Sequence, residues 1–176
     1  GARRVYLMEE PLAAAIGAGM NIKGAGGSMV IDIGGGTTDI AVLSLNGIVC
    51  KKSIKLAGRK LDEAIVRCVR TDRNVLIGEK MAERIKIEVG SVFYTEDKEM
   101  EAKGRNLHTG LPEKFVIRTS DIYDALMEQV MQIVTAVQQI LEITPPELSA
   151  DIWEDGLIMT GGGALLHGLG DLISQH

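Results

Sequence analysis

The sequence predicts an α/β fold, in which strands that end in glycine-rich turns are flanked by amphipathic helices. In residues 29–45, MVIDIGGGTTDIAVLSL, an apolar run meets three glycines and then resumes as an alternating, β-branched run. This pattern is typical of a strand, a tight turn and a second strand. In residues 157–166 another apolar run leads into glycines and then into a helical start. Residues 120–143 carry a regular apolar stripe with helical spacing.

The first glycine turn has the composition of a phosphate site. The turn consists of Gly34, Gly35 and Gly36 and is followed by Thr37 and Thr38. Glycines let backbone N–H groups approach an anion because no Cβ stands in the way, and the threonines add hydroxyl donors. Asp32, near the strand end, is placed to hold a hydrated divalent cation. The sequence therefore indicates phosphate and Mg²⁺, with a Gly-rich hairpin that binds nothing as the alternative.

Two common nucleotide motifs do not fit this turn. A Walker loop is excluded because no lysine follows the glycines, and a dinucleotide fingerprint is excluded because a strand follows them instead of a helix.

The composition limits the classes of function. The net charge of −5, with no basic stripe, argues against a nucleic-acid surface. The two cysteines, Cys50 and Cys68, are too few for a disulfide framework or a zinc site, so we expect buried thiols and a reducing cytoplasm. We expect no signal peptide before the first predicted helix. We also expect no membrane-spanning helix, because no apolar run approaches the ~18 residues that such a helix needs. Because the chain begins inside a strand-like segment, GARRVYL, we expect a piece of a longer protein.

The N-terminal part predicts a strand over 3–8 and an Ala-rich helix over 12–18, opened by Glu9, Glu10 and Pro11. Glu10 has two interpretations that the residues leave open. It is either an acid that stabilises the helix start or a general base that orients a water near phosphate.

The middle of the chain continues the sheet and then adds helices. Asn46-Gly47 predicts a hairpin to a third strand over 48–56, so that 29–57 forms an antiparallel meander. We expect Gly58 to end the meander, a helix over 61–69, a polar turn over 71–74 and a second helix from Gly78 that carries Glu83 and Lys86. Since those two side chains are spaced i, i+3, a surface ion pair is one interpretation.

Residues 91–110 are charged and broken by Gly104, and we expect them to be irregular, with a strand edge over 113–118. Ser120 is the predicted cap of a long helix that Thr144-Pro145-Pro146 ends. A short connection then leads to the strand over 157–159 and the glycines Gly161, Gly162 and Gly163. Two glycine turns at strand ends are expected to line one cleft.

Five ordered motifs resemble a known superfamily. DIGGGTTD at 32–39 and MTGGGALLHGL at 159–169 resemble the second phosphate motif and the adenosine motif of the actin/Hsp70 ATPases, and EEPLAAAIGAG at 9–19 resembles their connecting helix. IGEKMAERIKIEVGS at 77–91 and GRNLHTGLP at 104–112 resemble one branch, the bacterial MreB/Mbl family of actin-like rod-shape proteins. TPPELSADI, which begins at Thr144, also fits that branch.

The resemblance implies an RNase H-like (actin-like ATPase) core with a mixed sheet flanked by helices and a small inserted α+β subdomain. The core would span 1–71 and 120–176 and the insertion 72–119, which together make the second of the family's two large lobes. The first phosphate motif and the C-terminal connecting segment of the family are absent from this sequence.

The resemblance also implies site roles for ATP and Mg²⁺. The β and γ phosphates would contact Gly34, Gly35, Gly36 and Thr37. Asp32 would bind Mg²⁺ through water, and Glu10 would lie near the attacking water as the catalytic residue. The nucleoside would contact Glu83, Lys86, Gly161, Gly162 and Gly163.

The implied function is that of a filament-forming cytoskeletal ATPase lobe that determines rod shape. Self-association, cell-wall synthesis partners and a cytoplasmic location at the inner face of the membrane follow from the same resemblance. An Hsp70-like chaperone or reactivase lobe and a sugar or acetate kinase of the same fold remain alternatives. Asp39, where the family more often has Glu, and Arg59, where it more often has Asp, depart from the MreB pattern.

Overall fold

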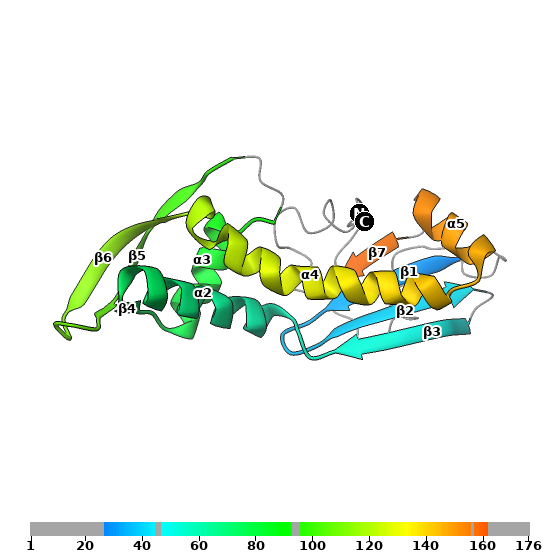
Figure 1. The fold of residues 1–176 in the computed structure, drawn as a ribbon, viewed down its shortest axis with the longest axis horizontal. Helices are drawn as coiled ribbons and strands as arrows, with labels where there is room; N and C mark the ends of the chain where they lie inside the picture. Colours follow the sequence, from blue (N-terminus) through cyan, green and yellow to red (C-terminus); the bar gives the residue numbers. More distant parts are fainter. Residues whose placement is uncertain (1–26, 45–46, 93–95, 156, 162–176) are drawn as a thin grey trace.

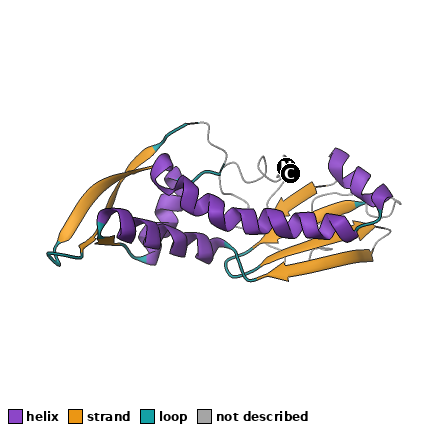
Figure 2. Ribbon diagram, viewed as in Figure 1, coloured by secondary structure: helices purple, strands orange, loops and turns teal. Residues whose placement is uncertain are grey.

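The computed structural model describes residues 27–44, 47–92, 96–155 and 157–161 (Figure 1). The strand predicted over 3–8, the helix predicted over 12–18 and the final helix predicted from 164 lie outside the described residues. Figure 2 shows two groups of strands, one at each end of the molecule, with helices between them.

The larger sheet has four strands, β1 (Ser28–Ile33), β2 (Thr38–Ser44), β3 (Gly47–Ile54) and β7 (Leu157–Thr160). Its order is β3-β2-β1-β7, with antiparallel pairs along the meander and β7 parallel to β1. The predicted meander and mixed sheet are therefore confirmed. Most of β1 is fully buried, as expected for a strand that is paired on both edges and covered on its faces.

Two long helices, α2 (Gly58–Arg73) and α4 (Thr119–Ile143), lie side by side, and α4 also packs on β2 and β3 (Figure 1). The predicted stripe of α4 is confirmed, because its members are all buried: Leu126, Val130, Ile133, Val137 and Ile140. A helix of this length connects the larger sheet to the smaller one at the other end of the molecule.

The smaller sheet contains β4 (Val75–Leu76), β5 (Glu99–Asn106) and β6 (Pro112–Arg118) in that order, all antiparallel, beside α3 (Glu79–Val89). The edge strand β6 and the helix α3 were predicted, and both are confirmed. The prediction that residues 91–110 form an irregular segment is wrong, because β5 occupies much of this range. Its inward residues Met100 and Ala102 are buried, whereas its outward residues are charged. Because the charged residues dominate the composition of this segment, the alternation of buried and exposed positions was not recognised in the sequence.

Other predicted boundaries are also corrected. α2 begins at Gly58 and runs through the expected turn to Arg73, where Asn74 ends it with φ 58°. Asn74, with a short polar side chain, is one of the residue types that tolerates this left-handed conformation. The connection expected after the prolines is a helix, α5 (Pro146–Asp155), because proline suits a first helical position.

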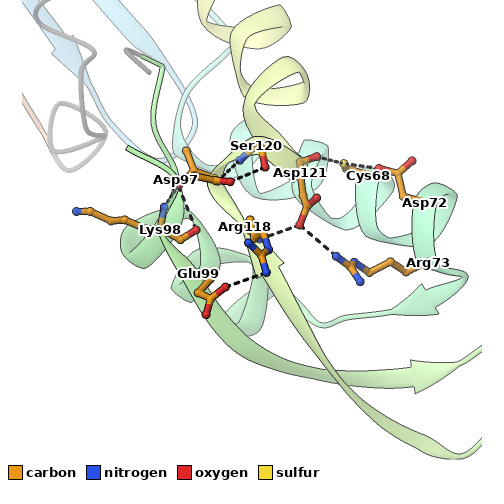
Figure 3. Close-up of polar contacts among 10 residues, drawn as sticks. Cys68, Asp72, Arg73, Asp97, Lys98, Glu99, Arg118, Ser120 and Asp121 are labelled. Atoms are coloured by element: carbon orange, nitrogen blue, oxygen red, sulfur yellow. Dashed lines mark hydrogen bonds and ion pairs between the residues drawn. The ribbon is translucent and has the colours of Figure 1, made fainter. Parts of the chain in front are cut away.

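Ser120 does not cap α4. The carboxylate of Asp121 accepts the backbone N–H of Arg118 at 2.8 Å, while the Ser120 N–H donates to Asp97 at 2.9 Å (Figure 3). Asp121 also forms an ion pair with Arg73 of α2 at 3.1 Å. The start of α4 is therefore fixed by groups from α2 and from the segment before β5.

Cys68 belongs to the same junction. Its thiol donates to the Asp121 carbonyl at 3.2 Å and lies 3.4 Å from the Asp72 carboxylate (Figure 3). Burial raises the pKa of Cys68 to about 12, with the two acids adding to the shift and Arg73 opposing it. Cys50 and Cys68 are both half-buried free thiols, so the expectation of buried thiols is only partly met.

Candidate functional site: two glycine turns at one sheet edge

The first glycine turn joins β1 to β2 and is closed by a hydrogen bond from Gly34 N–H to the Thr37 carbonyl at 3.0 Å. Gly35, Gly36 and Thr37 are exposed. Thr38, in contrast, is fully buried, and its hydroxyl donates to the Leu56 carbonyl at 2.6 Å. Only the first of the two threonines is therefore available to a ligand, and the expectation that both supply donors is wrong for Thr38.

The first residues of α2 hold the turn from one side. The N–H of Gly58 donates to the Gly34 carbonyl at 3.1 Å, and the N–H of Arg59 donates to the Gly35 carbonyl at 3.0 Å. In a trans peptide the N–H points opposite to the carbonyl of the preceding residue, and no described peptide is cis. The N–H groups of Gly35 and Gly36 therefore point away from α2, as donors for an anion need to do.

These bonds also explain why α2 starts earlier than predicted. A helix leaves its first N–H groups without intrahelical partners, and here the turn carbonyls supply two of those partners. Gly58 lies close to the turn and to Lys86: a Cβ on it would be 3.5 Å from Lys86 Nζ and 3.6 Å from the Gly34 carbonyl oxygen, which are ordinary van der Waals distances.

The second glycine turn begins beside the first. β7 pairs with β1 so that Thr160 lies opposite Asp32, and Gly161 follows with φ 84°. A Cβ on Gly161 would lie 2.3 Å from the Ile33 carbonyl oxygen and 2.8 Å from Asp32 Oδ1. The two turns therefore start at one edge of the sheet, while the expectation that they line one cleft stays a prediction. Gly162 and Gly163 lie outside the described residues, as does Glu10.

Lys86 reaches this region from α3. Its Nζ lies 2.9 Å from Asp62 Oδ1 and donates to the Gly58 carbonyl at 3.3 Å. The contact with Asp62 has the distance of an ion pair without the angle of a hydrogen bond, since Oδ1 has no hydrogen-bond partner. The alternative of a Glu83–Lys86 surface pair is wrong. Glu83 is exposed and has no ion pair among the described residues.

Arg59 also belongs to this site, although sequence reasoning gave it no role. A Cβ on Gly36 would lie 3.1 Å from Arg59 Nη2, and one on Gly35 would lie 3.6 Å from Arg59 Nε. The guanidinium therefore lies against the exposed turn. No local pattern in the sequence marked this role, because the predicted helix began at residue 61 and left Arg59 outside it.

The donor set at this edge fits Mg²⁺ bound together with phosphate. Mg²⁺ usually keeps several waters and takes only one or two carboxylates from the protein, and Asp32 can supply one. The described part of the chain contains no cluster of three or more metal-binding side chains. Within the same part, no helix is long and apolar enough to cross a membrane.

Comparison with known proteins identifies the family. The family described as "MreB/Mbl protein" matches residues 1–176. The chain is 51% identical over 176 residues to the cell shape-determining protein MreB of Escherichia coli K12, covering 99% of this chain and 51% of the relative. It is equally identical, 51%, to the cell shape-determining protein Mbl of Bacillus subtilis, covering 99% and 53%.

A solved structure of MreB5 of Spiroplasma citri bound to AMPPNP superimposes with a TM-score of 0.90 at 40% identity, covering 99% of this chain and 53% of that one. The fold is therefore that of an actin-like ATPase. The chain spans about half the length of the curated relatives it matches. These matches favour the predicted branch over the Hsp70-like alternative. With its mixed sheet, its paired glycine turns and a family match over all of its residues, this chain belongs to the MreB/Mbl family.

Proposed function

We propose that this chain binds the phosphates of Mg²⁺-ATP as the second lobe of an actin-like cytoskeletal ATPase. The observation that carries the proposal is that Asp32, the glycine turn over 34–36 and Gly161 lie together at one edge of the sheet. The likeness to a structure described as bound to AMPPNP supports it.

The geometry suggests a role for each group at this edge. The outward N–H groups of Gly35 and Gly36 would donate to phosphate oxygens, with the Thr37 hydroxyl beside them. Asp32 would hold Mg²⁺ through water, and the ion would supply positive charge between phosphate oxygens. Lys86, paired with Asp62, would hold the start of α2 close to the nucleoside. The exposed Glu83 side chain would contact the nucleoside.

The remaining roles rest on family resemblance. Glu10 would orient the attacking water, and Gly162 and Gly163 would run beside the adenosine. The core would comprise 1–71 and 120–176, with 72–119 as the inserted subdomain. The complete protein would form filaments in the cytoplasm at the inner face of the membrane, act with cell-wall synthesis partners and determine rod shape. The relatives named as cell shape-determining proteins support this assignment.

The test uses the full-length protein. Calorimetry with Mg²⁺-AMPPNP measures binding, and sedimentation with electron microscopy measures filaments. Asp32→Asn removes the carboxylate and should weaken Mg²⁺-dependent binding, whereas Glu63→Gln, on the exposed surface of α2, should leave it unchanged. A wild-type protein that neither binds Mg²⁺-AMPPNP nor assembles would contradict the proposal. Nucleotide binding without filaments would contradict only its cytoskeletal part.

A further inference from the structure

We propose that Arg59 is a phosphate ligand that makes this site favour a nucleoside triphosphate over a diphosphate. The inference rests on the proposed function, because it concerns the same turn.

The guanidinium lies beside the turn that, in the proposed function, binds the phosphates. The Arg59 backbone N–H is fixed on the Gly35 carbonyl at 3.0 Å, so the residue cannot move away from the turn without losing this bond. Its side chain occupies the space beside Gly35 and Gly36 that their missing Cβ atoms leave open. The guanidinium therefore lies beside the same two glycines whose N–H groups point outward.

The charges near the turn also favour this role. Asp32 and Asp39 lie opposite each other in the register of β1 and β2, and the turn itself contains no cation. A nucleoside triphosphate would add further negative charge to this place. The neighbouring cation Lys86 already pairs with Asp62. Among the described residues no ion pair includes Arg59, and its side chain is exposed. Arg59 is therefore a cation beside the turn that no described carboxylate neutralises.

Helix stability does not explain an arginine here. The N-terminus of a helix carries partial positive charge, which disfavours a cation in the first turn. The first turn of α2 contains no acidic residue that would offset this effect. The placement of Arg59 therefore opposes the helix dipole, and a bound anion would offset this cost. Arginine also suits such an anion, because its fork of donors matches phosphate oxygens.

The test compares nucleotides in the full-length protein by calorimetry, with Mg²⁺-AMPPNP and Mg²⁺-ADP. Arg59→Gln should weaken AMPPNP binding by about 10- to 100-fold, as expected for loss of a charge-assisted hydrogen bond, and weaken ADP binding by a clearly smaller factor. Arg59→Asp should weaken AMPPNP binding further, and Arg59→Lys should retain part of it. Arg70→Gln, an exposed arginine on the same helix, is the matched control and should change neither affinity.

Thermal melting without nucleotide separates this role from a structural one. Arg59→Gln should keep or raise the melting temperature, because it removes a cation from the positive end of α2. Equal losses of AMPPNP and ADP affinity, or a lower melting temperature with an unchanged affinity ratio, would overturn the inference. A wild-type protein that binds neither nucleotide would overturn the proposed function and this inference together. If the wild type binds both nucleotides and Arg59→Gln leaves both affinities unchanged, the inference about Arg59 is wrong while the proposed function still holds.

Discussion

Lys86 Nζ of α3 lies 2.9 Å from Asp62 Oδ1 of α2, and the two side chains are only 14% and 15% exposed. This pair joins α2, which holds the glycine turn over 34–36, to α3, which would border the nucleoside in the proposed function. Removal of one partner leaves a charge with little access to water, which costs more than the loss of a surface pair.

We therefore expect Lys86→Met to lower the free energy of unfolding by about 2 kcal/mol, less than the ~3–5 kcal/mol of a fully buried pair. Arg84→Met is the control on the same helix, since the Arg84–Glu88 pair is exposed and should contribute under about 1 kcal/mol. Urea unfolding of the full-length protein measures both values. Equal effects of the two substitutions would show that the Lys86–Asp62 pair has no special role.

Gly161 should tolerate no side chain. It has φ 84°, and a Cβ would overlap the Ile33 carbonyl and approach Asp32. Gly161→Ala should cost more than about 2 kcal/mol and should weaken Mg²⁺-nucleotide binding, because the overlap forces β7 away from β1. Gly110→Ala is a matched control, since Gly110 has φ 72° but no atom within 4 Å of its Cβ position. It should cost only about 1–2 kcal/mol, the strain of the left-handed backbone, and leave binding unchanged.

The same residues show which parts of the site could be predicted from the sequence. Asp32, the turn over 34–36 and Gly161 were predicted because each follows a local pattern of strand and glycine. The Lys86–Asp62 pair was missed because it depends on how two helices pack, and no spacing along one helix encodes it. Arg59 was missed for a related reason, since its role follows from the docking of α2 on the turn.

The same distinction applies to the fold. The meander and α4 have strong periodicity and were predicted, whereas β5 was missed because charged side chains cover its outward face. Gly104, which looked like a break, lies inside β5, where a Cβ would be 2.4 Å from a Val75 methyl and 2.6 Å from the Leu76 carbonyl oxygen. A glycine that permits close packing and one that breaks a strand look identical in sequence.

The start of α4 supplies a further stability prediction. Asp121→Ala removes the acceptor of the Arg118 N–H and the ion-pair partner of Arg73, and should cost about 1–2 kcal/mol. Ser120→Ala should cost less than about 1 kcal/mol, because the Ser120 hydroxyl forms only an exposed bond to Asp97. Chemical denaturation of the two variants compares them directly. A larger effect at Ser120 would return it to the capping role that the sequence suggested.

The raised pKa of Cys68 leads us to expect a loss of stability at alkaline pH. Its pKa is raised from 9.0 to about 12, so the folded state holds the thiol proton more tightly than the unfolded chain does. This contribution is complete below pH 9 and is lost as pH rises from about 9 to 12. The free energy of unfolding should therefore fall more between pH 8 and about 11 in the wild type than in Cys68→Ser. Cys50→Ser is the control and should retain the wild-type slope.

The two threonines of the turn separate ligand binding from folding. Thr38→Val leaves the buried Leu56 carbonyl without its donor and should cost about 1–3 kcal/mol of unfolding free energy. Thr37→Val removes an exposed hydroxyl whose described contact is a long one, 3.4 Å from Asp39, so stability should change little. Because the Thr37 hydroxyl would donate to a phosphate oxygen, the same change should weaken Mg²⁺-AMPPNP binding about two- to tenfold.

Both threonine variants keep the shape of the side chain, so the comparison isolates the hydroxyl group. Denaturation and calorimetry on the two full-length variants give four values. The expected pattern is loss of stability for Thr38→Val and loss of affinity for Thr37→Val. If Thr37→Val instead lowers stability and leaves affinity intact, its hydroxyl serves the fold through Asp39, and the turn contacts phosphate through backbone N–H groups alone.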